Sequence, residues 1–412
     1  MESKESQMKK ILILIFFISN FLLGQTPCGT DIYNKFYIDS NPEFYKSIEN
    51  QLQNYLKNTP KSFANITIPI VFHVVWINRI QNLHDSVIYH QVEVLNKIFN
   101  SQNADTINLT DTLKNWRGNF NINFEIAHRD PNGFPTNGIT RKKTIQPSFS
   151  YWGDLVKKSH YGTSPWPPNR YLNIWICDLN EGLQGYAQFP GGPVETDGIV
   201  IDWQTVGNQI YPWIPVGNYE WAKGKVLVHE IGHWLNLYHP WGNEHSGCGE
   251  DYIPEIHHQN GPIYPGQACP DTMFSSCFDS NRIFIKHYMD YAGSSCMCTF
   301  TKNQVLRGLA SLNTYRNEMI NSYEPKPIIN GFENTKIYPT YVLDKLYLEF
   351  PEYQGRISIS IYNLQGKLVS TFGVQNKPYT LLYLSNLSNG IYIVNLSHKE
   401  KIVLNKKILI NK

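Results

Sequence analysis

The sequence predicts an α+β fold followed by a small all-β domain, and three observations indicate it. Up to residue 320, apolar runs rich in β-branched residues alternate with helical patterns, which is typical of a mixed sheet with helices packed on it. Residues 323–331 are proline-rich and are expected to form a linker. Residues 332–412 alternate apolar and polar positions between short turns, as the strands of a small β-domain do.

The N-terminal region precedes this fold. Residues 1–24 are expected to be a secretory signal peptide, because two lysines precede the apolar run "ILILIFFISNFLLG". That run is too short and too close to the terminus for a membrane-spanning helix. Residues 25–64 are polar with scattered aromatic residues, and we interpret them as a prosegment. The main domain follows at 65–322, with strands expected at 66–77, 122–127, 170–179, 185–192 and 197–203.

Three helices are expected in the main domain. The first can be capped by Asp85 or Ser86, and its apolar residues recur at helical spacing. The last covers residues 299–320 and opens with Thr301 and Gln304, which are spaced as a capping box. The helix between them carries the residues from which a function can be inferred.

The stretch "HEIGHWLNLYH", residues 229–239, places three histidines in an apolar helix. His229 and His233 are four residues apart, so they share one helix face and can bind one Zn²⁺ ion. His239 can join them only if the chain turns after His233, and Asn236 tolerates the left-handed conformation that ends helices.

Glu230 lies beside the first histidine but points off the face that the histidines share. A carboxylate there can take a proton from a water that zinc activates, which is the H-E-x-x-H arrangement of a metallopeptidase. The alternative is a chance match in a buried helix, with each histidine hydrogen-bonded in a core. The third histidine after a turn-forming residue makes a catalytic zinc site the better interpretation.

Composition and cysteines restrict the class of protein. The net charge is +2 and no block of like charge occurs, so nothing indicates nucleic-acid binding. No later stretch could cross a membrane, so the mature chain is expected to be soluble and exported. Seven cysteines leave at least one outside a disulfide. Cys177 lies in an apolar strand and is expected to be a buried thiol, and Cys28 stands alone near the mature N-terminus. The region after the zinc helix holds Cys248, Cys269, Cys277, Cys296 and Cys298.

Together with "HYMDYA" (287–292), the histidine motif resembles the signature and Met-turn of the metzincins. Taken alone, Met289 between two tyrosines would be ordinary core filling. The closer resemblance is to the pappalysin (cytophagalysin) branch and covers essentially residues 60–320. It is carried by "GITR", "YLNIWIC", "GYAQFPG", "DGIVI" and "YMDYAGSSCMCTFTKNQ".

The resemblance implies a metzincin-type zincin: a twisted mixed sheet with a backing helix and an active-site helix, above an irregular, disulfide-bonded lower subdomain. Glu230 would be the general base and acid. Met289 would form an apolar floor under the metal, and Tyr291 would reach the zinc shell. The implied zinc ligands are His229, His233 and His239, and the implied disulfides are Cys248–Cys277 and Cys269–Cys296.

The resemblance also implies a structural Ca²⁺ ion near the first of these cysteines. The Asp-Thr-Pro that usually follows it is replaced by "CGEDYIPEI" (248–256), in which Glu250 and Asp251 still offer oxygen ligands. The resemblance implies that residues 292–295 shape the pocket for the residue after the scissile bond, and these residues carry no charge here. We therefore expect weak or no preference for arginine in that pocket and a wider acceptance of apolar residues.

The tail resembles the C-terminal sorting domain of the type IX (Por) secretion system. The matching pieces are "IYPTYVLDKLYLEF", "ISIYNLQGKLV", "LSNLSNGIYIVNL" and "KKILIN". A sorting domain would be recognised by that secretion machinery and removed after export. The alternative is an unrelated β-sandwich, such as a carbohydrate-binding module.

These observations predict a secreted zinc endopeptidase whose substrates are proteins or peptides. The alternative is a non-catalytic, zinc-stabilised surface adhesin, but a purely structural site needs no base such as Glu230 and usually has four protein ligands. Pappalysin-type proenzymes can carry a Cys-Gly-Thr in the prosegment, which residues 28–30 match. A Cys28 thiolate would fill the open zinc position and keep the precursor latent. An intermolecular disulfide or an inert thiol are the alternatives for Cys28.

Overall fold

The computed structural model describes most of the chain. The described residues are 27–58, 65–132, 136–180, 182–207, 221, 223–242, 247–264, 269, 272–274, 277, 282–321, 335–349, 356–375, 379–398 and 401–412. The expected signal peptide (1–24) and linker (323–331) lie outside these residues. Within them, no helix has both the length and the apolar character needed to cross a membrane.

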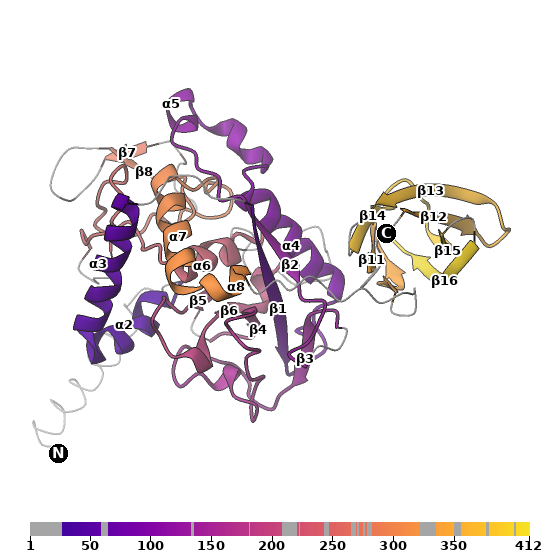
Figure 1. Cartoon of the computed structure of the whole chain (residues 1–412), viewed down its shortest axis with the longest axis horizontal. Coiled ribbons are helices and arrows are strands. Elements are labelled where there is room, and N and C mark those ends of the chain that lie inside the picture. Colours follow the sequence, from indigo (N-terminus) through magenta and orange to yellow (C-terminus); the bar gives the residue numbers. More distant parts are fainter. Residues whose placement is uncertain are drawn as a thin grey trace, which may run out of the picture.

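A six-stranded mixed sheet forms the centre of the main domain (Figure 1). Its order is β2-β1-β4-β6-β5, with β3 also paired to β1, and every pairing is parallel except β5 with β6. The strands are β1 (Ile66–Trp76), β2 (Ile122–Ile126), β3 (Ile139–Lys143), β4 (Leu172–Cys177), β5 (Gly185–Ala187) and β6 (Ile199–Asp202). The sequence predicts all of these except β3, whose "ITRKK" alternates exposed cations with partly covered residues.

Two helices pack on one face of this sheet, as the sequence predicts: α4 (Asp85–Phe99) backs it, and α6 (Lys225–Trp234) carries the histidines. The N-cap of α4 is His84, not Asp85 or Ser86. His84 has the extended backbone of a cap, and its ring accepts the N–H of Ser86, whereas Asp85 is already helical.

The helix expected at 299–320 is two helices, α7 (Lys302–Tyr315) and α8 (Asn317–Asn321), and α7 opens with the predicted capping box. Five short helical turns lie in those connections of the main domain that the structure describes. They are η1 (Ala104–Asn108), α5 (Asp111–Lys114), η2 (Leu155–Lys157), η3 (Val194–Thr196) and η4 (Trp203–Thr205).

The residues interpreted as a prosegment form two helices that the sequence analysis did not predict. They are α2 (Thr30–Ser40), which contacts β5, and α3 (Pro42–Asn58), which lies along α7 (Figure 1). The described part of α3 buries only Ile48 and Leu52, one turn apart. Tyr45, Ile48, Leu52 and Tyr55 nevertheless recur at helical spacing, so the sequence did carry the periodic signal of this helix.

The region after α6 contains little regular structure beyond the hairpin of β7 (Thr272–Phe274) and β8 (Arg282–Phe284). Two disulfides join Cys248 to Cys277 and Cys269 to Cys296, which are the pairs that the family resemblance implied. The two disulfides hold this irregular region together, a role that an apolar core has in regular structure. Cys177 is fully buried, as expected.

The C-terminal region has its own apolar core between two sheets. One sheet has the order β10-β16-β15-β12-β13 and the other the order β14-β11-β9. The strands are β9 (Lys336–Tyr338), β10 (Tyr341–Val342), β11 (Lys345–Glu349), β12 (Arg356–Asn363), β13 (Leu368–Gln375), β14 (Tyr379–Tyr383), β15 (Gly390–His398) and β16 (Lys401–Ile410). The predicted α+β domain followed by a small β-sandwich is confirmed.

Candidate metal centre and active site

The three histidines of the motif converge on one point. The Nε2 atoms of His229 and His233 are 2.9 Å apart, and the Nε2 atom of His239 is 3.2 Å and 3.1 Å from them. All three rings are buried. The first two histidines lie on adjacent turns of α6, so the helix geometry alone brings them together.

His239 reaches this point because α6 ends in a Schellman turn. Asn236 has φ +70°, its N–H donates to His233 O (2.7 Å), and the N–H of Leu237 donates to Gly232 O (2.9 Å). The left-handed residue reverses the chain so that the third ring points back at the other two. The expected role of Asn236 as a helix terminator is confirmed.

Each ring is oriented by a hydrogen bond at its Nδ1 atom. The acceptors are Tyr288 O for His229 (2.7 Å), Leu237 O for His233 (2.8 Å) and the Asp31 carboxylate for His239 (2.8 Å). A proton on each Nδ1 leaves the three Nε2 lone pairs directed at one another. Burial lowers the pKa of His229 to about 3, so the ring is neutral, the form that binds a metal.

Cys28 supplies a fourth donor, since its Sγ atom and one nitrogen of each histidine all lie within 4.8 Å of one another. A set of three imidazoles and a thiol fits Zn²⁺ and not the hard cations Ca²⁺ or Mg²⁺. Burial, followed by the charges of Glu230 and Asp31, raises the pKa of the Cys28 thiol. A bound zinc ion would oppose this, because a thiol that coordinates a metal is deprotonated.

The floor beneath the histidines is Met289. A Cβ atom added at Gly232 would lie 2.3 Å from the Met289 Sδ atom, so the sulfur packs directly against the backbone of α6. The ring of Tyr291 lies 5.1 Å from that of His239, and its hydroxyl donates to Cys28 O (3.5 Å). Both residues therefore lie where the family resemblance implied.

Glu230 is buried on the neighbouring face of α6. Its Oε2 atom accepts the Thr30 hydroxyl (2.9 Å) and faces the Cys28 thiol (3.7 Å), while its Oε1 atom has no hydrogen-bond partner among the described residues. Burial raises the pKa of Glu230 to about 8. A Cβ atom at Gly185 would approach Glu230 Cγ to 2.9 Å, so only glycine in β5 admits this carboxylate.

The outer edge of β5 is covered by residues 29–34. The N–H of Gly29 donates to Gly185 O (2.9 Å), and the Thr30 hydroxyl accepts the N–H of Ala187 (2.9 Å). The side-chain amide of Asn34 donates to Ala187 O and accepts the N–H of Phe189, both at 2.8 Å. The Asn34 side chain thus makes the pair of hydrogen bonds that a backbone peptide group would make if another strand lay beside β5.

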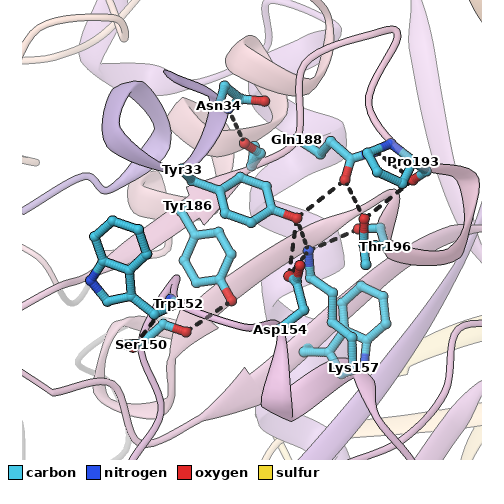
Figure 2. A network of polar contacts seen from close by, with 12 residues as sticks. Tyr33, Asn34, Ser150, Trp152, Asp154, Lys157, Tyr186, Gln188, Pro193 and Thr196 are labelled. Atoms are coloured by element: carbon cyan, nitrogen blue, oxygen red, sulfur yellow. Dashed lines mark hydrogen bonds and ion pairs between the residues drawn. The ribbon is translucent and has the colours of Figure 1, made fainter. Parts of the chain in front are cut away.

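A buried polar network holds α2 against the main domain (Figure 2). The Tyr33 hydroxyl donates to Asp154 (3.0 Å) and accepts from Lys157 (2.9 Å), whose ammonium also lies 3.0 Å from Asp154. That ammonium donates in addition to Thr196 O (2.8 Å) and lies over the Tyr33 ring. Tyr33 of α2 therefore supplies the hydroxyl that links Asp154 and Lys157.

With Pro27 and Cys28 in its wall, the space beside Glu230 is a cavity of about 20 Å³, enough for about one water molecule. Its apolar walls include Trp221, Val226 and Met297. The site is closed to a polypeptide in this form of the chain.

The structure brings together the zinc ligands, Glu230, Met289, Tyr291 and Cys28 that the sequence predicts. Sequence reasoning missed Thr30 and Asp31, which bind Glu230 and His239. The Cys-Gly-Thr match contained a signal for Thr30, but nothing in the sequence paired Asp31 with a histidine about 200 residues away.

The expected calcium ligands do not converge in the same way. Asp251 is buried and its Oδ1 atom accepts the N–H of Ile253 (2.9 Å), whereas Glu250 lies 3.4 Å from His258 Nε2. A calcium ion at this loop stays a prediction.

Comparisons with known proteins agree with this geometry. Residues 156–313 match the model of the pregnancy-associated plasma protein-A peptidase family, and residues 336–411 match a secretion system C-terminal sorting domain. A promirolysin mutant from Tannerella forsythia is 36% identical, with a TM-score of 0.63, over 72% of this chain and 97% of that one. Mature mirolysin from Tannerella forsythia, in complex with a cleaved peptide, is 40% identical, with a TM-score of 0.58, over 63% of this chain and 97% of that one.

A relative named extracellular metalloprotease, from Arthroderma benhamiae, is 24% identical over 79% of this chain and 95% of its own length. The similarity therefore extends across the main domain.

Proposed function

The chain belongs to the pregnancy-associated plasma protein-A (pappalysin) family of metallopeptidases, and we propose that it is the latent precursor of a secreted zinc endopeptidase in which Glu230 is the general base and acid. The family makes it a metalloendopeptidase, and its sorting tail and extracellular relatives make it a secreted or cell-surface protein. The roles of the individual residues, the zinc and the latency are the proposal.

The observation that supports the proposal most strongly is the position of Glu230 beside the convergent histidines. When bound there, a zinc ion would act as a Lewis acid on water and on the scissile carbonyl. The unpartnered Oε1 atom of Glu230 can take the proton of the attacking water and pass it to the leaving amine. The Tyr291 hydroxyl, held beside the histidines, can donate to the oxyanion that develops.

The edge of β5 supports a polypeptide substrate. Its backbone groups are now bound by Gly29, Thr30 and Asn34, which imitate a strand. Once these leave, an extended peptide can form the same hydrogen bonds across Glu230.

We propose that residues 25–64 are the inhibitory segment and 65–322 the catalytic domain. Cys28, Thr30 and Asp31 together occupy the metal centre, the base and the third histidine. The share of this chain that is covered falls from 72% with promirolysin to 63% with mature mirolysin, in support of a removable segment. Domain 332–412 would address the chain to type IX secretion and be removed afterwards.

The adhesin alternative predicts a closed site with four protein ligands, and Cys28 does complete such a set here. The fourth ligand, however, belongs to the segment that also blocks Glu230 and β5. A permanent structural site would have no need of a carboxylate with one oxygen unpartnered. The alternative therefore predicts that removing the prosegment releases no activity.

The test is hydrolysis of casein or gelatin by the processed protein. We expect peptide release that 1,10-phenanthroline abolishes and added Zn²⁺ restores. His239→Ala should lose both activity and bound zinc, measured by metal analysis after dialysis, because two imidazoles cannot replace three. Hydrolysis that persists without metal would overturn the proposal.

The pocket for the residue after the scissile bond is predicted to accept apolar side chains and to show weak or no preference for arginine. The Lys225 ammonium donates to Ser294 O (2.7 Å) and Met297 O (2.6 Å) and is itself paired with the Asp105 carboxylate, so no unpaired charge is added to the uncharged segment 292–295. The Asp290 carboxylate already accepts from Ile263 N, Tyr291 N and Gln259. Cleavage-site profiling on a proteome-derived peptide library checks this, and a profile dominated by arginine would contradict it.

A further inference from the structure

Arg307 of α7 is a buried cation that the proposed mechanism does not use. Its side chain is 1% exposed, and its two terminal nitrogens donate to the two carboxylate oxygens of Glu49 at 2.8 and 2.7 Å. Its Nε atom donates to Asn236 O (2.9 Å), the carbonyl of the turn that ends α6. The guanidinium also lies 5.1 and 5.0 Å from the ring centres of Tyr238 and Tyr252.

These contacts divide between two parts of the chain. Asn236, Tyr238 and Tyr252 belong to the catalytic domain, so they remain when the prosegment is removed. Glu49 belongs to α3 and leaves with it. The guanidinium would then be held by its hydrogen bond to Asn236 O and by the two tyrosine rings. Its two terminal nitrogens would face the position that the Glu49 carboxylate had occupied. That geometry matches a carboxylate in the bidentate arrangement.

Asp251 is the other acidic residue whose charge acts on Arg307. No hydrogen bond joins the two side chains among the described contacts, and the Oδ1 atom of Asp251 is held by the N–H of Ile253. Asp251 therefore does not fill the position of Glu49.

Successive ring contacts connect this position to the metal centre. The Phe189 ring lies 5.8 Å from that of His233 and 5.0 Å from that of Tyr238, which in turn contacts Arg307. Phe189 lies two residues beyond the end of β5, the edge where we place the substrate. The prosegment follows this route itself, with Cys28 at the histidines, Asn34 at Phe189 and Glu49 at Arg307. At about 3.3 Å per residue, an extended substrate would cover it in roughly four to six residues.

We propose that Arg307 in the processed enzyme forms a subsite for an acidic substrate residue, roughly four to six residues from the scissile bond on the side toward Phe189. The inference rests on the proposed function. It assigns Glu49 a second role: in the precursor its carboxylate occupies the subsite that a substrate aspartate or glutamate takes later.

The experiment uses peptides that share one cleavable core and carry a single glutamate at each position from two to seven residues on either side of the bond, each paired with its glutamine counterpart. We expect kcat/KM to be about tenfold higher for glutamate than for glutamine at one position or two adjacent positions, mainly through KM. Arg307→Gln should abolish this preference, and Arg307→Lys should reduce it. Lys302→Gln, an exposed cation on the same helix, is the matched control and should keep it.

A second measurement does not depend on hydrolysis. A peptide of residues 27–58 should bind the processed protein, and Glu49→Gln should weaken that binding about tenfold while Glu43→Gln, an exposed acid on the same helix, should not. Normal hydrolysis without any glutamate preference would overturn the subsite and leave the peptidase assignment standing. Absence of hydrolysis would count against the proposed function, and the peptide variants would still decide whether Arg307 binds a carboxylate.

Discussion

Replacing Glu230 with glutamine is expected to leave the fold and bound zinc intact while kcat falls by about 10²–10⁴-fold. The amide has the shape of the carboxylate, so it fits the close approach of Gly185, and the three imidazoles are untouched. Only the proton carrier is lost. The measurement is steady-state hydrolysis by the processed enzyme, with zinc determined in the same preparation.

Glu195→Gln is the matched control for Glu230→Gln, since this carboxylate is exposed on the short helix η3 and takes no part in the site. The control should keep both activity and zinc. If Glu230→Gln retained more than a small fraction of activity with its zinc in place, the assignment of the base would be wrong.

Replacing Cys28 with alanine in the full precursor is expected to shorten latency, with self-processing or peptide hydrolysis at least about tenfold faster. Among the described residues of the prosegment, only this thiol offers a metal donor within the histidine cluster, and without it the fourth metal position can admit water. Thr30 and Asp31 would still bind Glu230 and His239, so the precursor should fold with its prosegment docked. The time course of processing, with Glu230 intact, is the measurement.

Phe36→Ala is the control for Cys28→Ala, because this residue of α2 is 68% exposed and should leave latency unchanged. Equal latency of the wild type and Cys28→Ala would exclude the thiol as the lock. The inert-thiol interpretation would then hold, and the hydrogen bonds of Thr30 and Asp31 would have to account for the closed site.

Local sequence patterns were sufficient to predict most strands of the main sheet and the convergence of the three histidines. Strands such as β1 and β4 are continuous apolar runs, and α6 places His229 and His233 together through helix geometry alone. The turn at Asn236 follows from the tolerance of asparagine for positive φ, so even the third histidine could be predicted. The edge strand β3 could not, because its half-exposed "ITRKK" lacks the apolar run that identifies a buried strand.

The sequence by itself therefore predicted the three convergent histidines, the carboxylate beside them and the order of the α+β and β-sandwich regions, because each depends on spacing within one element or on a local motif. Apart from Cys28, which the sequence placed beside the histidines, only the tertiary structure showed which side chains cover them. Asp31 meets His239, Thr30 meets Glu230 and Glu49 meets Arg307 across separations of 208, 200 and 258 residues. Such pairs form where α2 packs on β5 and α3 packs on α7. Hydrogen-bond direction and burial select those partners, and neither leaves a periodic trace in the sequence.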